Sequence, residues 1–88
     1  MRKIKLTGRE ISVVRAIGFD ESILGAQVQE CTQMHAEDVT DTLNSLISAG
    51  FAESHPYYDE VSLAQMPVTA FEINPSYALG LKVAILRR

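Results

Sequence analysis

The chain has 88 residues, of which 47% are hydrophobic and 22% are charged, and its formal net charge is −3 at pH 7. This length suits one small domain, residues 1–88, and the hydrophobic share argues against a disordered chain. No apolar run approaches the roughly 20 residues that cross a bilayer, and the basic N-terminus lacks the apolar stretch of a secretory signal. The single Cys31 cannot form an internal disulfide, so we expect a cytoplasmic protein.

The first predicted helix follows a short alternating segment. Residues 3–6 place Ile4 and Leu6 on one side and could form a strand. Thr7 and Glu10 have the spacing of a capping box, which predicts that a helix begins after Thr7. Its apolar face consists of Ile11, Val14 and Ile17, and a glycine, Gly18, is expected to end it.

A second helix is expected to run to about Thr32. Any of three polar residues could cap its N-terminus: Asp20, Glu21 or Ser22. Leu24, Val28 and Cys31 recur at i, i+4 and i+7, so they predict one buried stripe of this helix. Residues 33–35 then form a short break before the next helix.

A third helix is predicted from about Ala36 to Ala49, with His35 at its cap position and Gly50 at its end. Its apolar face consists of Val39, Leu43, Leu46 and Ile47. We expect this face to pack with Val28, Ile11 and Val14 in a single core.

The pattern changes after Gly50. Residues 51–54 look like a strand that His55-Pro56 interrupts, residues 57–67 are irregular or wing-like, and residues 68–73 form a second strand. Phe51 and Phe71 are expected in the core of this ribbon. Asn74-Pro75 is typical of a helix start, which predicts a final helix through the tail; a strand over residues 83–86 is the alternative.

This order of elements resembles the winged helix-turn-helix superfamily. The residues that carry the resemblance are 25–54, GAQVQECTQMHAEDVTDTLNSLISAGFAES. Val28, Cys31 and Met34 match apolar positions of the second helix and turn, and Gly50-Phe51 matches the exit into the first strand. The resemblance implies a mainly α fold with a small β-ribbon (α+β): three helices, a two- or three-stranded wing and a C-terminal helix. It is a hydrophobic frame and not a chemical motif, so it bears on fold more than on function.

Charge is distributed unevenly along the chain. The basic residues are Arg2, Lys3, Lys5, Arg9, Arg15, Lys82, Arg87 and Arg88, so none lies between residues 16 and 81. Ten of the eleven acidic residues lie in that stretch. A recognition helix normally contacts base edges while Lys and Arg neutralise phosphates, but the third helix carries Glu37, Asp38 and Asp41 and no base. The first two acids also suit the positive end of the helix dipole.

Catalytic and metal-binding motifs are missing from the sequence. There is no G-x-S-x-G, no glycine-rich phosphate loop and no cluster of Cys and His at metal-ligand spacing. We therefore expect no enzyme activity, no metal and no cofactor.

Two function classes remain open. The first is an interaction or regulatory module that contacts a protein partner or itself, with a candidate surface made of Glu37, Asp38, Asp41, Tyr57 and Tyr58. The second is a DNA-binding transcriptional regulator. In that case the phosphate contacts would come from Arg9, Arg15, Lys82, Arg87 and Arg88, if the two ends form one basic patch away from the third helix.

The final predicted helix is apolar on all sides. Residues 77–86 contain one charge, Lys82. A helix with apolar groups all round must be buried all round, which predicts a homodimer built on this segment, with the first helix as an expected second contributor. The candidate dimer contacts are Tyr77, Leu81 and Ile85.

Overall fold

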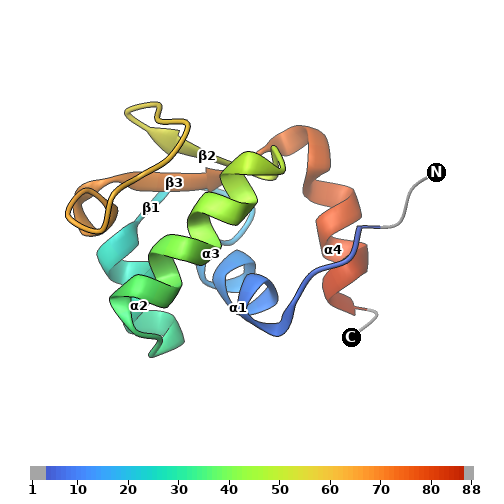
Figure 1. Cartoon of the computed structure of the whole chain (residues 1–88). Helices are drawn as coiled ribbons and strands as arrows, with labels where there is room; N and C mark the ends of the chain where they lie inside the picture. Colours follow the sequence, from blue (N-terminus) through green and yellow to red (C-terminus); the bar gives the residue numbers. More distant parts are fainter. Residues whose placement is uncertain (1–3, 87–88) are drawn as a thin grey trace.

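A computed structural model describes residues 4–86 and has an α+β arrangement, which confirms the predicted class at that level (Figure 1). In the described range the helices are α1 (Gly8–Ile17), α2 (Gly25–Thr32), α3 (Ala36–Ser48) and α4 (Ala78–Leu86). The strands are β1 (Ile23–Leu24), β2 (Ala52–His55) and β3 (Ala70–Ile73). Two short 3-10 helices, η1 (Met66–Val68) and η2 (Pro75–Tyr77), precede β3 and α4 respectively.

Helix α1 begins as its sequence predicts. The Thr7 hydroxyl accepts from the Glu10 N–H at 3.2 Å, and the Glu10 carboxylate accepts from the Thr7 N–H at 2.8 Å. Gly18 ends the helix with φ at +76°, a conformation that side chains disfavour. The expected strand over residues 3–6 is wrong for residues 4–6, which adopt no strand; Lys3 lies outside the described residues.

The start of the second helix differs from the prediction. Residues 23–24 form strand β1, which pairs antiparallel with β3, and α2 begins only at Gly25. Leu24 is therefore an exposed cap residue and not part of a buried stripe. Cys31 lies in the last turn of α2 and is also exposed, whereas Val28, about one turn earlier, is fully buried. Both burial predictions were wrong.

The sheet has the order β1-β3-β2, with β3 in the centre. Side chains alternate across it, as the pleat requires. Ala52 and Ser54 of β2 and Phe71 and Ile73 of β3 face the helices, whereas Glu53 pairs opposite Glu72 on the outer face. The inner face covers α1 and α3, so the sheet fixes the position of α3 through its C-terminal end.

A single hydrophobic core joins the helices to the sheet. The six core positions expected from helical spacing are all buried in it: Ile11, Val14, Val28, Val39, Leu43 and Leu46. Phe71 is fully buried as expected. Phe51 is only partly buried and sets its ring against Tyr77 in an edge-on contact, with 5.1 Å between ring centroids. No helix in the described part of the chain is long and apolar enough to span a bilayer.

Helix α4 stands at the end of the molecule opposite β1 (Figure 1). The Asn74 side chain accepts from the Ser76 N–H at 3.0 Å, so the predicted helix start is confirmed and the alternative strand over residues 83–86 is wrong. Leu81 and Ile85 are buried in the core of this single chain. They therefore cannot serve as the dimer contacts that the sequence predicted, because one side of α4 already packs on its own domain.

The connection between β2 and β3, residues 56–69, does not project as a free hairpin. Val61 and Met66 are buried in the core, and η1 packs against α2. Gly25 permits this approach: a Cβ there would lie against the Met66 carbonyl oxygen and only 2.7 Å from the Met66 sulfur. The connection thus folds back over the helices and lies beside α3.

Candidate interaction surface

The outward side of α3 carries acidic and small polar residues. Glu37, Asp41, Ser45 and Ser48 lie about one or two turns apart and are exposed, so they form one stripe. The connection adds Asp59 and Glu60, and Glu60 borders the same hollow as Asp41. The name acidic face is used below for Glu37, Asp38, Asp41, Asp59 and Glu60. Among the residues that line the hollows along α3, Arg9 is the only base.

The threonines of α3 are not available to a ligand. The Thr40 hydroxyl donates to the Ala36 carbonyl at 2.8 Å, and the Thr42 hydroxyl donates to the Asp38 carbonyl at 2.7 Å. Both residues are buried. His35 holds the cap position of α3, as predicted, but its side chain makes no capping hydrogen bond. The hydroxyls of Thr40 and Thr42 are therefore not free to read a base edge.

Asn44 clamps the connection to α3. Its amide nitrogen donates to the Val61 carbonyl at 2.9 Å, and its amide oxygen accepts from the Val61 N–H at 2.8 Å. A side-chain amide matches a peptide group in this way because it offers one donor and one acceptor side by side. The pair satisfies both backbone groups of a buried residue, so Asn44 serves the fold.

Replacing Asn44 with Ala should release the connection. Both Val61 backbone groups would lose their partner, at a cost of about 1–3 kcal/mol for each group that stays buried. We expect a lower free energy of unfolding in urea and faster hydrogen exchange at the Val61 amide. The exposed neighbour Ser45, changed to Ala, is the control and should alter stability by less than about 0.5 kcal/mol. Unchanged exchange at Val61 in the Asn44 variant would contradict the clamp.

Arg9 does not join a basic patch remote from the third helix. Its guanidinium lies 3.4 Å from the Asp38 carboxylate at the start of α3, and it borders a hollow shared with Asp41. Lys82 instead lies on α4 over the Phe19 ring, 5.1 Å from its centroid. Arg15 is exposed on α1, and Arg87 and Arg88 lie outside the described residues. The expected single patch is thus wrong for Arg9, because the first turn of α3 attracts it.

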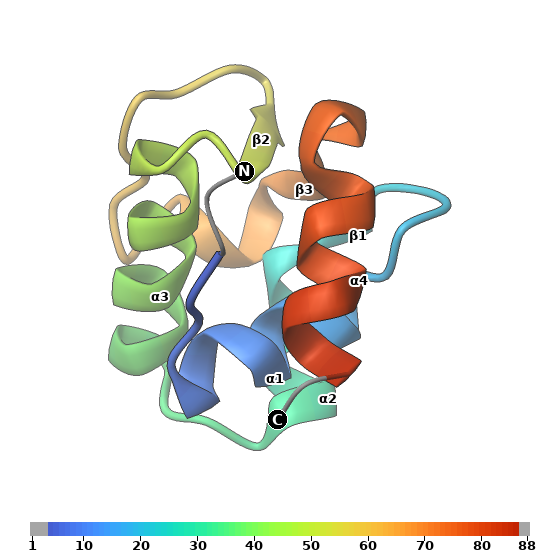
Figure 2. The same ribbon diagram turned by 90° about the vertical axis from the view of Figure 1, so that its right-hand side faces the viewer.

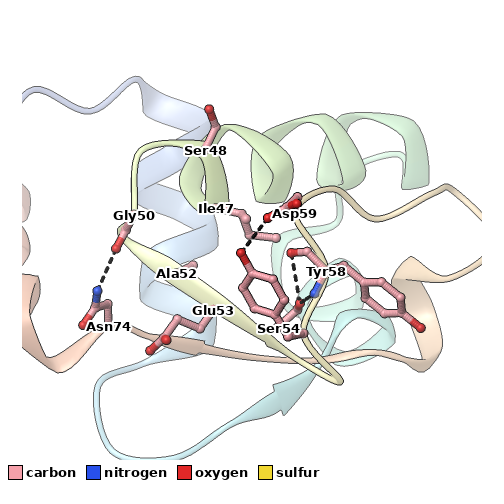
Figure 3. A pocket seen from close by; sticks show the side chains of 10 residues that line it. Ile47, Ser48, Gly50, Ala52, Glu53, Ser54, Tyr58, Asp59 and Asn74 are labelled. Carbon is pink, nitrogen blue, oxygen red and sulfur yellow. Dashed lines mark hydrogen bonds between the residues drawn. The ribbon is translucent and has the colours of Figure 1, made fainter.

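A groove of about 490 Å³ lies between the C-terminal end of α3, strand β2 and the connection (Figure 3). Ile47 and Ser48 line it from α3, Glu53 from β2 and Asp59 from the connection. The sequence did not identify Glu53 or Ser48 as candidate site residues. They line one groove with Asp59 only because the connection folds back beside α3 and β2.

The two tyrosines of the connection have different environments. Tyr57 is 72% exposed, and its hydroxyl donates to the Asp59 carboxylate at 2.5 Å. This hydrogen bond, together with the negative charge of Asp59, raises the pKa of Tyr57 above its ordinary value. Tyr58 is partly buried against the core, and its N–H donates to the Ser54 hydroxyl at 2.8 Å. Of the two, Tyr57 is the more exposed to solvent.

Within residues 4–86 the remaining ionisable groups form no metal-binding cluster. No group of three or more His, Cys, Asp or Glu side chains in that range could hold a metal ion. His55 lies 2.6 Å from Glu72 on the outer face of the sheet, where both side chains are open to solvent. This pair bridges neighbouring strands at the surface.

Comparison with known proteins adds no relative: no family model, no curated protein and no solved structure matches the chain. The functional conclusion therefore rests on the surface described above.

Proposed function

We propose that the chain is a non-enzymatic interaction module of the winged helix-turn-helix type that binds a protein partner through its acidic face. The order α1, β1, α2, α3, β2, β3 and the strand order β1-β3-β2 support this fold assignment. In such a fold α3 takes the place of the recognition helix and the connection takes the place of the wing.

One observation carries the functional part of the proposal. Thr40, Thr42 and Asn44 of α3 make hydrogen bonds within the fold, while the carboxylates of Glu37 and Asp41 on the same helix are exposed. Duplex DNA is a polyanion that proteins bind mainly by neutralising its phosphates with Lys and Arg. An outward row of carboxylates would repel that backbone, but would complement a basic protein surface.

The chemistry of the face indicates the kind of partner. Asp41 and Glu60 lie across one hollow, and Glu53 and Asp59 line the groove beside it. The exposed ring of Tyr57 borders this groove and offers rigid amphipathic contact area, which protein interfaces favour. A partner segment with Lys or Arg next to an apolar or aromatic residue fits this combination.

DNA binding by the basic ends is the alternative. It would use the exposed Arg15 and Lys82, with Arg9 withdrawn from Asp38. Breaking that ion pair costs little, since exposed pairs contribute about 0–1 kcal/mol. However, Arg9 pairs with Asp38 at the acidic start of α3, whereas Lys82 lies over Phe19 on α4. A duplex that contacts Arg9 would therefore also approach carboxylates. The acidic protein-binding face is the simpler arrangement.

A selection experiment tests the proposal without a known partner. A library of displayed random peptides is selected on the immobilised chain, and the recovered peptides are measured against two charge-reversed variants. Asp41→Lys changes the acidic face, whereas Glu30→Lys makes the same charge change on the exposed side of α2. We expect cationic peptides whose affinity falls at least about ten-fold for Asp41→Lys, since like charges across an interface cost several kcal/mol. Peptides that bind both variants equally would overturn the proposal.

A further inference from the structure

The outer side of α4 is an aliphatic stripe that its own domain leaves uncovered. Leu79 is 77% exposed, Val83 42% and Leu86 83%. They recur at i, i+4 and i+7, so they lie on one face of the helix, opposite Leu81 and Ile85, which pack in the core. Scattered single aliphatic residues are normal on a surface, but a continuous stripe along one helix indicates an association surface.

Among the described residues, the two flanks of this stripe carry opposite net charges: one base, Lys5, lies on one flank, and two acids, Asp20 and Glu21, lie with one base, Lys82, on the other. On one flank the N-terminal segment lies against α4: a Cβ on Gly80 would be 2.8 Å from Ile4 Cδ1. The next residue of that segment, Lys5, is exposed. On the other flank Lys82 lies over Phe19, in the turn that also exposes Asp20 and Glu21. Figure 2 shows α4 in front, with the N-terminal segment on its left and the α1–β1 turn on its right.

We propose that this stripe is the interface of a homodimer in which the two α4 helices pack side by side and run in the same direction. A two-fold axis along α4 exchanges the left and right flanks between protomers, which brings Lys5 of one protomer toward Asp20 and Glu21 of the other. An antiparallel pair would keep like flanks together and set Lys5 against Lys5. Charge complementarity therefore selects a second copy in the parallel arrangement, with Leu79, Val83 and Leu86 each facing its own counterpart.

The dimer is distinct from the proposed partner surface. The acidic face lies on α3 and the connection, and the stripe lies on α4 at one end of the molecule (Figure 1). Either surface can therefore fail its test without affecting the other. A dimer of this kind would present two acidic faces to one partner assembly.

The first measurement is the mass in solution by light scattering at micromolar concentration. We expect twice the 9.7 kDa of one chain, and a single-chain mass for Leu79→Asp and Leu86→Asp with unchanged circular dichroism. The control is Leu63→Asp, at a leucine of the connection that is 50% exposed, and this change should leave the dimer intact. A wild-type mass of 9.7 kDa would overturn the proposal. This holds also if the monomer uses the stripe to bind anionic lipid vesicles.

The second measurement fixes the orientation. In a Cys31→Ser background, Leu79→Cys and Leu86→Cys are oxidised separately. Parallel helices bring each residue near its own copy, so both variants should form cross-linked dimers; a disulfide requires Cα atoms within about 7 Å. Lys5→Glu should weaken the dimer about two- to five-fold, the range of an exposed ion pair, and Asp20→Lys should restore it in the double variant. Cross-linking only between a Leu79→Cys chain and a Leu86→Cys chain would overturn the parallel arrangement.

Discussion

Replacing Leu43 with Ala should lower the free energy of unfolding by about 2–5 kcal/mol, the range for truncating a buried leucine. Leu43 is fully buried, and it lies on the inner side of α3 among residues from several elements of the core. The loss combines the hydrophobic transfer of the removed methyl groups with the cavity that remains. Urea denaturation followed by circular dichroism measures it, and the slope of the unfolding curve should not change.

The matched control is Leu63→Ala. Leu63 is 50% exposed in the connection, so its truncation should cost less than about 1 kcal/mol. Equal losses for the two leucines would mean that α3 does not pack its inner side into this core. In that case the assignment of the acidic residues to the outer side of α3 would also be wrong.

The second large effect is expected from Gly25→Ala. The added methyl group would lie against the Met66 carbonyl oxygen and 2.8 Å from the carbonyl carbon, and backbone cannot move aside as a flexible side chain can. The Gly25 N–H also donates to the Thr69 carbonyl at 2.9 Å, which holds the two segments together. Over-packing typically costs about 1–3 kcal/mol, and the backbone contact places this variant at the upper end. Thermal unfolding should therefore occur at a clearly lower temperature.

Gly80→Ala is the corresponding control. A methyl group there meets the Ile4 side chain, with its flexible far end, Cδ1, the nearest atom at 2.8 Å. Alanine also favours a helix interior over glycine by about 1 kcal/mol. We expect this variant to lie within about 1 kcal/mol of the parent protein. If Gly25→Ala proved equally mild, η1 would not be packed against α2, and the connection would be free to move away from α3.

The helical part of the fold could be predicted because its signals are local. The capping box at Thr7, the apolar spacing of α1 and α3, and the Asn74-Pro75 start all act within one or two turns. Strand β1 could not be predicted in this way, because two residues carry no periodicity and pair with β3 about 47 positions away. The exposure of Leu24 and Cys31 follows from that missed strand and the shorter helix after it.

The candidate surface was predictable in charge but not in geometry. The absence of Lys and Arg between residues 16 and 81 is visible in the sequence, and so are the acids of α3. Nothing in the sequence shows that Asn44 binds the Val61 backbone, or that Arg9 turns toward Asp38, because both contacts join segments distant in the chain. For α4, composition indicated excess apolar surface, but only the packing of Leu81 and Ile85 identifies which residues remain exposed.

The central claim, that the α3 side of the molecule serves a protein and not a nucleic acid, is tested most directly by fluorescence anisotropy with a labelled random duplex DNA over a range of salt concentrations. We expect weak or no binding at physiological salt, because the acidic face repels phosphates. Sub-micromolar binding that strengthens as salt is lowered would contradict this claim. In that event Arg9, Arg15 and Lys82 would be the contacts, and replacing each would reduce the salt dependence by about one unit.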